Sequence, residues 1–361
     1  MNTKPAISAQ KTRDSNIELL RIIAMLLVLI VHTSFFTIGV PTHAETIAEP
    51  AKSSIRFLVQ SIAIISVNLF VFISGWYGIR PKMKRFVEFI FQIVFFYAII
   101  FAIFHVIDPD KWTGKTIVKY MLFIEDANWF IKAYIFLYLL SPVINKYVKS
   151  ASRNSFRWLV IAFFCFQFFY GWYFDDVKWF SHGYSTMSFI GLYLLASYIK
   201  QHSTRLIRLP FWINIALWLA MTLATTAITF HLTQSIPQGD IRPYFDYNSP
   251  LVIAATVFLF LAFNRLHFKS AIVNWIAISC FAAFLLHFCP AFMDGVFQPV
   301  IMGAYTQLSY SSFLAYALVF VLAIFSAAII IDKIRISVWK LILIISDNLC
   351  SIYSQKKNHS N

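Results

Sequence analysis

Long apolar runs separated by short polar stretches dominate the chain. The runs are continuous, which predicts helices of membrane-crossing length. Shorter segments of about ten residues with alternating polarity are instead typical of membrane β-barrels. Ten spans are expected, over residues 17–38, 55–78, 86–107, 129–147, 158–174, 184–199, 211–231, 249–264, 271–291 and 312–331. The pattern therefore predicts an all-α fold, a polytopic transmembrane helical bundle.

Composition narrows the class of protein further. Of the 361 residues, 59% are hydrophobic and 13% are charged, whereas a soluble domain is about 25% charged. This excludes a soluble globular enzyme, a disordered chain and a disulfide scaffold. The formal net charge of +14 raises the question of nucleic-acid binding, but basic residues of membrane proteins gather in cytoplasmic loops. We expect contact with membrane lipid and none with nucleic acid.

The distribution of charge predicts an orientation. With the N-terminus in the cytoplasm, most of the 30 lysine and arginine residues fall on the inner side and most acidic residues fall outside. The positive-inside rule then predicts that both termini are cytoplasmic, in a multi-pass protein of the cytoplasmic (inner) membrane. Three segments are expected: a polar cytoplasmic segment at 1–16, a transmembrane domain at 17–333, and a cytoplasmic amphipathic helix with a tail at 334–361.

The first apolar run carries polar residues that hydrocarbon disfavours, so they are candidates for function. Arg21 and His32 are eleven positions apart, which places them on one face of a helix and about 16.5 Å apart along its axis. Arg21 suits a phosphate at the inner edge, and His32 suits a general base for a hydroxyl. Glu18 is placed to pair with Arg21. The structural alternatives are snorkelling of Arg21 and an interhelical hydrogen bond of His32.

Several segments, taken in order, resemble acyltransferase family 3. The run ELLR at 18–21 is followed, after ten further residues, by His32, as in the family's first helix. Further similar segments are NLFVFISGWYG at 68–78, the basic cluster Arg80, Lys82, Lys84 and Arg85, NWFIKAYIFLYLLSPVIN at 128–145, IGLYLLASYI at 190–199 and IAISCFAAFLLH at 276–287. The cluster departs from a plain Arg-x-x-Arg, which leaves open which of its members contact a ligand. The resemblance covers about residues 16–335.

The resemblance implies transfer of an acyl group, usually acetyl, from coenzyme A to a hydroxyl of a cell-envelope or exported carbohydrate. Acetyl-CoA is then the co-substrate, and a carbohydrate or glycolipid is the acceptor. The residues expected to bind the donor are Arg21, Arg80, Lys82, Lys84 and Arg85. We favour direct attack by the acceptor with His32 as the base, and an acyl-histidine intermediate is the alternative.

Four more residues are candidates for a supporting role. Ser74 and Gly75 close the second run, where small residues also permit close packing of helices. Trp129 is either a residue of the interfacial aromatic belt or part of an acceptor site. His287 lies in the outer part of the ninth run, where it can face the same cavity as His32. The sequence contains no HExxH motif or other metal-ligand spacing and no GxSxG motif, so no metal is expected.

Two other functions fit the same pattern. A polytopic transporter or flippase of a glycan or lipid-linked sugar would also carry buried charges, but it would not consume an acyl donor. A non-catalytic membrane scaffold would tolerate the replacement of His32 and Arg21. Turnover of labelled acetyl-CoA separates an enzyme from both.

Overall fold

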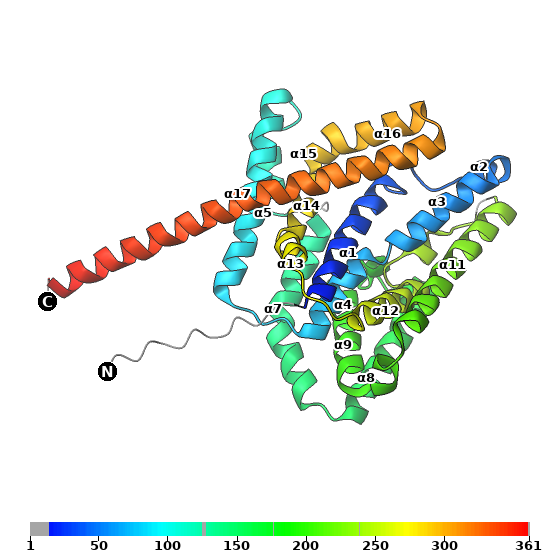
Figure 1. The fold of residues 1–361 in the computed structure, drawn as a ribbon, viewed down its shortest axis with the longest axis horizontal. Coiled ribbons are helices and arrows are strands. Elements are labelled where there is room, and N and C mark those ends of the chain that lie inside the picture. The colour runs from blue at the N-terminus through cyan, green and yellow to red at the C-terminus, as the bar shows by residue number, and fades with distance from the viewer. Residues whose placement is uncertain (1–13, 125–127, 176, 238, 360–361) are drawn as a thin grey trace.

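The fold is a bundle of helices, shown in Figure 1. The computed structural model describes residues 14–124, 128–175, 177–237 and 239–359, and every regular element in these ranges is helical. The prediction of an all-α fold is therefore confirmed. Most of the N-terminal segment predicted at 1–16, namely residues 1–13, lies outside the described residues.

The elements follow one another with short connections. The first half contains α1 (Ser15–Thr33), α2 (His43–Ala48), α3 (Pro50–Ala63), α4 (Ser66–Tyr77), α5 (Met83–Ile107), α6 (Gly114–Met121), α7 (Trp129–Ser150), α8 (Arg153–Phe168) and the π-helix η2 (Phe169–Tyr173). The second half contains η3 (Ser181–Gly183), α9 (Thr186–His202), α10 (Thr204–Ile207), α11 (Phe211–Ser235), η4 (Arg242–Phe245), α12 (Pro250–Asn264), α13 (Ala271–Ala277), α14 (Cys280–His287), α15 (Pro290–Phe292), η5 (Met293–Phe297), α16 (Gln298–Gln307) and α17 (Tyr310–His359).

Fewer helices reach membrane-crossing length than the ten apolar runs predict. Within the described ranges six helices are long and apolar enough to cross a membrane, or seven if the bent pair Ala271–His287 and Pro290–Gln307 forms one span. Two of the predicted runs lie largely in α8 and α9, which have 16 and 17 residues, or about 24–26 Å of helix against a hydrocarbon core of about 30 Å. The structure thus supports six to seven apolar spans. The count of ten and the cytoplasmic termini stay predictions.

The last helix is longer than the run that predicts it. It continues without a break through 50 residues, so the expected boundary between residues 333 and 334 falls inside α17. Figure 1 shows the second half of α17 extending beyond the other helices. Near the middle of α17 the buried Asp332 accepts a hydrogen bond from Gln92 of α5 at 2.9 Å and one from Arg335 at 2.9 Å. The bond between Gln92 and Asp332 ties α17 to α5.

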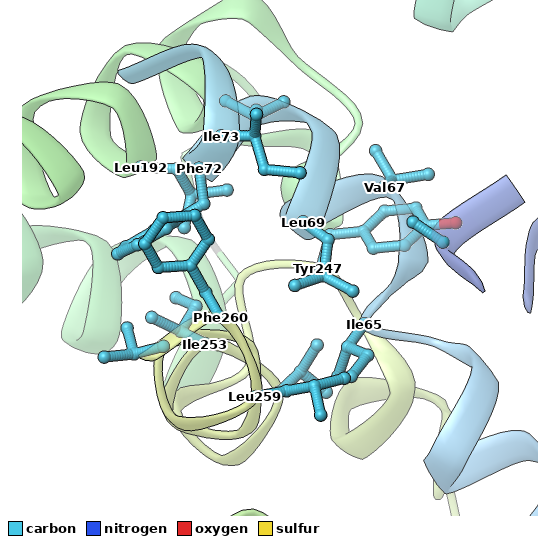
Figure 2. Packing of buried hydrophobic residues seen from close by; sticks show 14 of the residues in the cluster. Ile65, Val67, Leu69, Phe72, Ile73, Leu192, Tyr247, Ile253, Leu259 and Phe260 are labelled. Carbon is cyan, nitrogen blue, oxygen red and sulfur yellow. The ribbon is translucent and has the colours of Figure 1, made fainter. Parts of the chain in front are cut away.

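Helix α1 contributes to two apolar clusters on different sides. Leu20 and Ala24 belong to a cluster formed largely by α4, α9 and α12, while Met25 and Leu29 belong to a cluster formed largely by α5, α14 and α17. Figure 2 shows the first cluster, where side chains of α4 meet those of α9 and α12. Because neighbouring helices pack on both sides of α1, polar side chains on it meet protein groups.

At Gly75 the backbones of α4 and α9 approach each other closely. A Cβ at Gly75 would lie 2.5 Å from the carbonyl oxygen of Tyr193 and 2.7 Å from its Cα. The hydroxyl of Ser197 donates a hydrogen bond to the carbonyl oxygen of Gly75 at 2.9 Å. Absence of a side chain at Gly75 is therefore what lets the two backbones meet.

We expect Gly75→Ala to lower the free energy of unfolding by about 1–3 kcal/mol, because the backbone of α9 must shift to admit the methyl group. Gly303→Ala is the matched control, since nothing lies within 4 Å of a Cβ at Gly303. Alanine is favoured over glycine in a helix by roughly 0.5–1 kcal/mol. Thermal unfolding of the solubilised protein compares the variants, and equal melting temperatures would contradict the packing.

Candidate active site

One stripe of α1 faces the interior spaces of the bundle. Arg21, Met25, Val28 and His32 line cavities, and their spacing of three to four residues keeps them on one side of the helix. Arg21 lines one cavity and His32 lines another. The shared face expected from the sequence is therefore present.

His32 pairs with His287, a residue of α14. The Nδ1 atom of His32 lies 2.9 Å from the Nε2 atom of His287. On its other side, Nδ1 of the buried His287 meets the carbonyl oxygen of Ala283, which only accepts hydrogen bonds. We assign the tautomers from this network: His287 donates through Nδ1 and accepts through Nε2, so His32 donates through Nδ1. In its neutral form, His32 then presents Nε2 as an acceptor.

The imidazole of His32 is held between aromatic rings. The ring of Phe288 stacks on it at a centroid distance of 4.6 Å, and the edge of Phe36 meets it at 5.1 Å. With one nitrogen bonded to His287 and two ring contacts, the plane of the imidazole is defined. A fixed ring is what a positioned proton acceptor requires.

His32 lines an apolar space that we call the histidine chamber; its empty volume, part of it open to solvent, is about 500 Å³. Its lining residues are Met25, Val28, Val31, His32, Val67, Phe70, Trp129, Phe130, Tyr247, Phe281, Phe284 and Phe288. In Figure 2 the Tyr247 hydroxyl points toward the ribbon of α1. Such a lining is mostly apolar and leaves His32 among a few polar groups.

A second space, the arginine cavity, lies nearer the N-terminal end of α1; its empty volume, part of it open to solvent, is about 900 Å³. Three guanidinium groups line it together with tyrosine and phenylalanine rings. Its full lining consists of Arg21, Ile73, Ser74, Tyr77, Gly78, Ile79, Arg80, Arg85, Phe86, Phe89, Tyr134, Ile135 and Tyr138. Arg21 pairs with Glu18 at 3.0 Å, as its spacing predicted. The site is cationic and suits phosphate groups.

The loop between α4 and α5 carries Arg80, and hydroxyl groups of other helices hold its backbone. Gly78 adopts a φ of 76°, which favours glycine. The Ile79 N–H donates to the Tyr193 hydroxyl at 2.9 Å, and the Lys82 N–H donates to the Tyr138 hydroxyl at 2.8 Å. Arg80 of this loop and Arg85 of the first turn of α5 line the cavity, whereas Lys82 and Lys84 are not among its lining residues. All four side chains are exposed.

A layer of aromatic rings separates the two spaces. Phe89 of the arginine cavity stacks on Phe281 of the histidine chamber at 5.3 Å, and Tyr134 of the cavity stacks on Phe130 of the chamber at 5.9 Å. The guanidinium groups and the imidazole therefore face adjoining spaces along the same helix.

The supporting residues occupy different places. The Ser74 hydroxyl lines the arginine cavity, donates to the Phe70 carbonyl at 2.8 Å and lies 3.2 Å from the Tyr134 hydroxyl. Gly75 instead packs against α9. Trp129 lines the histidine chamber, and His287 contacts His32 directly.

Sequence reasoning did not single out Tyr247 or Phe288. Phe288 follows His287 directly, and this adjacency is the only sequence signal for it. Tyr247 reaches the chamber from the segment before α12 and has no local signal. Among the described residues no group of three or more His, Cys, Asp or Glu side chains is placed to hold a metal ion.

Apolar helices of spanning length and enclosed polar side chains define a multi-pass helical membrane protein. A family model described as an acyltransferase domain matches residues 14–332. The chain belongs to this family, acyltransferase family 3, and is a membrane acyltransferase. The resemblance found in the sequence is thereby confirmed. A search of the curated proteins and a search of the solved structures each found no match to the chain.

Proposed function

We propose that this acyltransferase moves an acetyl group from acetyl-CoA to a hydroxyl of a cell-envelope or exported carbohydrate. The observation that carries the proposal is the arrangement along α1, with arginines lining one space and the Nε2 atom of His32 in the adjoining one. We further propose that the arginine cavity opens to the cytoplasm and that the protein resides in the cytoplasmic membrane.

Donor binding follows from charge. The phosphates of coenzyme A are strong acceptors for guanidinium groups, so Arg21, Arg80 and Arg85 are the proposed contacts. The pantetheine arm would pass the aromatic layer and carry the thioester toward His32. Lys82 and Lys84 lie outside the cavity lining and would act only through the general positive charge.

In the proposed step, Nε2 of His32 accepts the proton of the acceptor hydroxyl as its oxygen attacks the thioester carbonyl carbon. The tetrahedral intermediate collapses with cleavage of the carbon–sulfur bond. The coenzyme A thiolate leaves and takes the proton back from the imidazolium of His32. The products are an acetyl ester and free coenzyme A. In the alternative order, Nε2 attacks the thioester first and forms an acyl-histidine.

The test uses the purified protein in lipid nanodiscs with labelled acetyl-CoA and the oligosaccharide fraction of the producing cell's envelope. We expect release of free coenzyme A together with labelled ester on the carbohydrate. A transporter or flippase reconstituted in vesicles would move saccharide across the bilayer without consuming donor. Saccharide transport with no release of coenzyme A would overturn the proposal.

For donor binding, we expect Arg85→Gln to raise KM for acetyl-CoA by about ten- to hundredfold, since a hydrogen bond to a charged group contributes about 1.5–3 kcal/mol. Acetyl-pantetheine, which lacks the phosphates, should be used equally poorly by the variant and the wild type. The matched control is Arg157→Gln, because Arg157 is exposed on α8 and bonds Asn154. An equal change for both donors would argue against phosphate binding by Arg85.

A further inference from the structure

A third space opens on the other side of Trp129 from the histidine chamber. We call it the Trp129 groove; its empty volume, part of it open to solvent, is about 1130 Å³. It is lined by Trp129, Lys132, Ala133, Phe136, Ser181, Tyr184, Ser185 and Thr186, which come from α7 and from the segment that leads into α9. Trp129 is the residue that lines both the groove and the chamber.

Three aromatic rings form the wall between these spaces. The ring centroids of Trp129 and Tyr184 are 4.6 Å apart, those of Tyr184 and Tyr247 are 4.8 Å apart, and those of Trp129 and Tyr247 are 5.9 Å apart. Tyr184 lines the groove and is exposed, whereas Tyr247 is buried and lines the chamber. A molecule that contacts this wall from the groove therefore lies at the boundary of the space that contains His32.

The backbone beside the wall is held in an unusual conformation. Ser181, His182 and Gly183 have φ values of 42°, 54° and 91° in succession. The Tyr247 N–H donates to the His182 carbonyl at 3.0 Å, and a Cβ at Gly183 would lie 2.5 Å from the Cβ of Tyr247. Left-handed conformations of non-glycine residues cost energy and persist only where the surroundings fix them. The segment therefore fixes Tyr247 relative to the groove.

The chemistry of the lining identifies the ligand class. Trp129 and Tyr184 offer aromatic faces, and Ser181, Ser185 and Thr186 carry hydroxyl groups. A pyranose ring has an apolar C–H face that packs on aromatic rings, and its hydroxyls exchange hydrogen bonds with serine, threonine and tyrosine. Ser185 and Thr186 already bond Ser188 and the Ala133 carbonyl, but their hydroxyl oxygens keep capacity to accept a further hydrogen bond. The combination of aromatic faces and hydroxyl groups fits a saccharide better than a purely apolar chain.

We propose that the Trp129 groove is the acceptor site, which binds a saccharide against Trp129 and Tyr184 and directs one of its hydroxyls toward His32. This proposal rests on the proposed acyl transfer and adds the place from which the acceptor arrives. Donor and acceptor would then approach the histidine chamber from opposite sides, the donor past Phe89 and Phe281 and the acceptor past Trp129.

The experiment measures KM for each substrate in nanodiscs. Two acceptors are compared: the delipidated oligosaccharide fraction of the producing cell's envelope, and the same fraction still attached to lipid. The acceptor with the lower KM shows whether the groove takes a free or a lipid-linked saccharide. Tyr184→Ala is expected to raise the acceptor KM at least tenfold while KM for acetyl-CoA stays within twofold. Tyr184→Phe, which keeps the ring, is expected to restore most of the acceptor affinity.

The matched control is Trp179→Ala. Trp179 is 71% exposed, lies in the same part of the chain and is not among the groove's lining residues. An unchanged acceptor KM in Tyr184→Ala, or a rise in the donor KM instead, would overturn the acceptor site while the wild type still transfers acetyl groups. If the wild type itself releases no coenzyme A, the proposed function fails and the acceptor site fails with it.

Discussion

Replacement of His32 by glutamine is expected to lower kcat for acetyl transfer by about 10²–10⁴-fold, the usual contribution of a positioned general base. Glutamine keeps a polar side chain but cannot take up the proton of the acceptor hydroxyl. Because the arginine cavity is a separate space along α1, the affinity for acetyl-CoA should change little. Initial rates and equilibrium binding of labelled acetyl-CoA, both in nanodiscs, measure the two quantities.

The matched control for His32 is His231→Gln. His231 is exposed near the end of α11, where its Nδ1 atom lies 3.5 Å from the hydroxyl oxygen of Ser235. This control is expected to keep the wild-type rate, and only the His32 variant should lose activity. If His32→Gln retained the wild-type kcat, neither general-base catalysis nor an acyl-histidine would be tenable. Acid-quenched protein that carries label on His32 would favour the acyl-histidine order.

The second large effect is expected at His287. In His287→Phe an aromatic ring is kept, but the Nδ1–H of His32 loses its acceptor. An unsatisfied buried donor costs about 1–3 kcal/mol, so the expected loss in kcat is roughly ten- to hundredfold, with KM for both substrates nearly unchanged. Steady-state kinetics of the single variant tests this directly.

A double variant distinguishes positioning of His32 from a general packing role of His287. If His287 acts through His32, adding His287→Phe to His32→Gln should cause little further loss of kcat, since the two residues act as a unit. Independent losses that multiply in the double variant would mean that His287 supports the protein in another way. Melting temperatures of all three variants show whether folding is affected.

Much of the fold class and part of the site were predictable because they depend on local patterns. Continuous apolar runs predicted a helical membrane protein, and helix periodicity placed Arg21 and His32 on one face. The Glu18–Arg21 ion pair followed from a spacing of three residues. The number of spans was less predictable, because several apolar runs form shorter helices or, as with Ala271–His287 and Pro290–Gln307, bend by 64° at a break.

The basic cluster illustrates what a sequence leaves open. Arg80, Lys82, Lys84 and Arg85 are all cationic and close in the chain, yet only the two arginines line the cavity. Hydroxyl groups from α7 and α9 hold the loop backbone that carries Arg80, whereas the first turn of α5 places Arg85. No local pattern encodes such bonds.

The amino-acid order alone was enough to establish a helical membrane bundle, the family resemblance and the shared face of Arg21 and His32 on the first helix. Each of these follows from local patterns along the chain. The packing of distant helices was needed for the rest. His32 and His287 are 255 positions apart and meet at 2.9 Å, and Tyr247 joins Trp129 and Tyr184 from a separate segment. Such contacts depend on how whole helices pack, and helix periodicity carries no information about them.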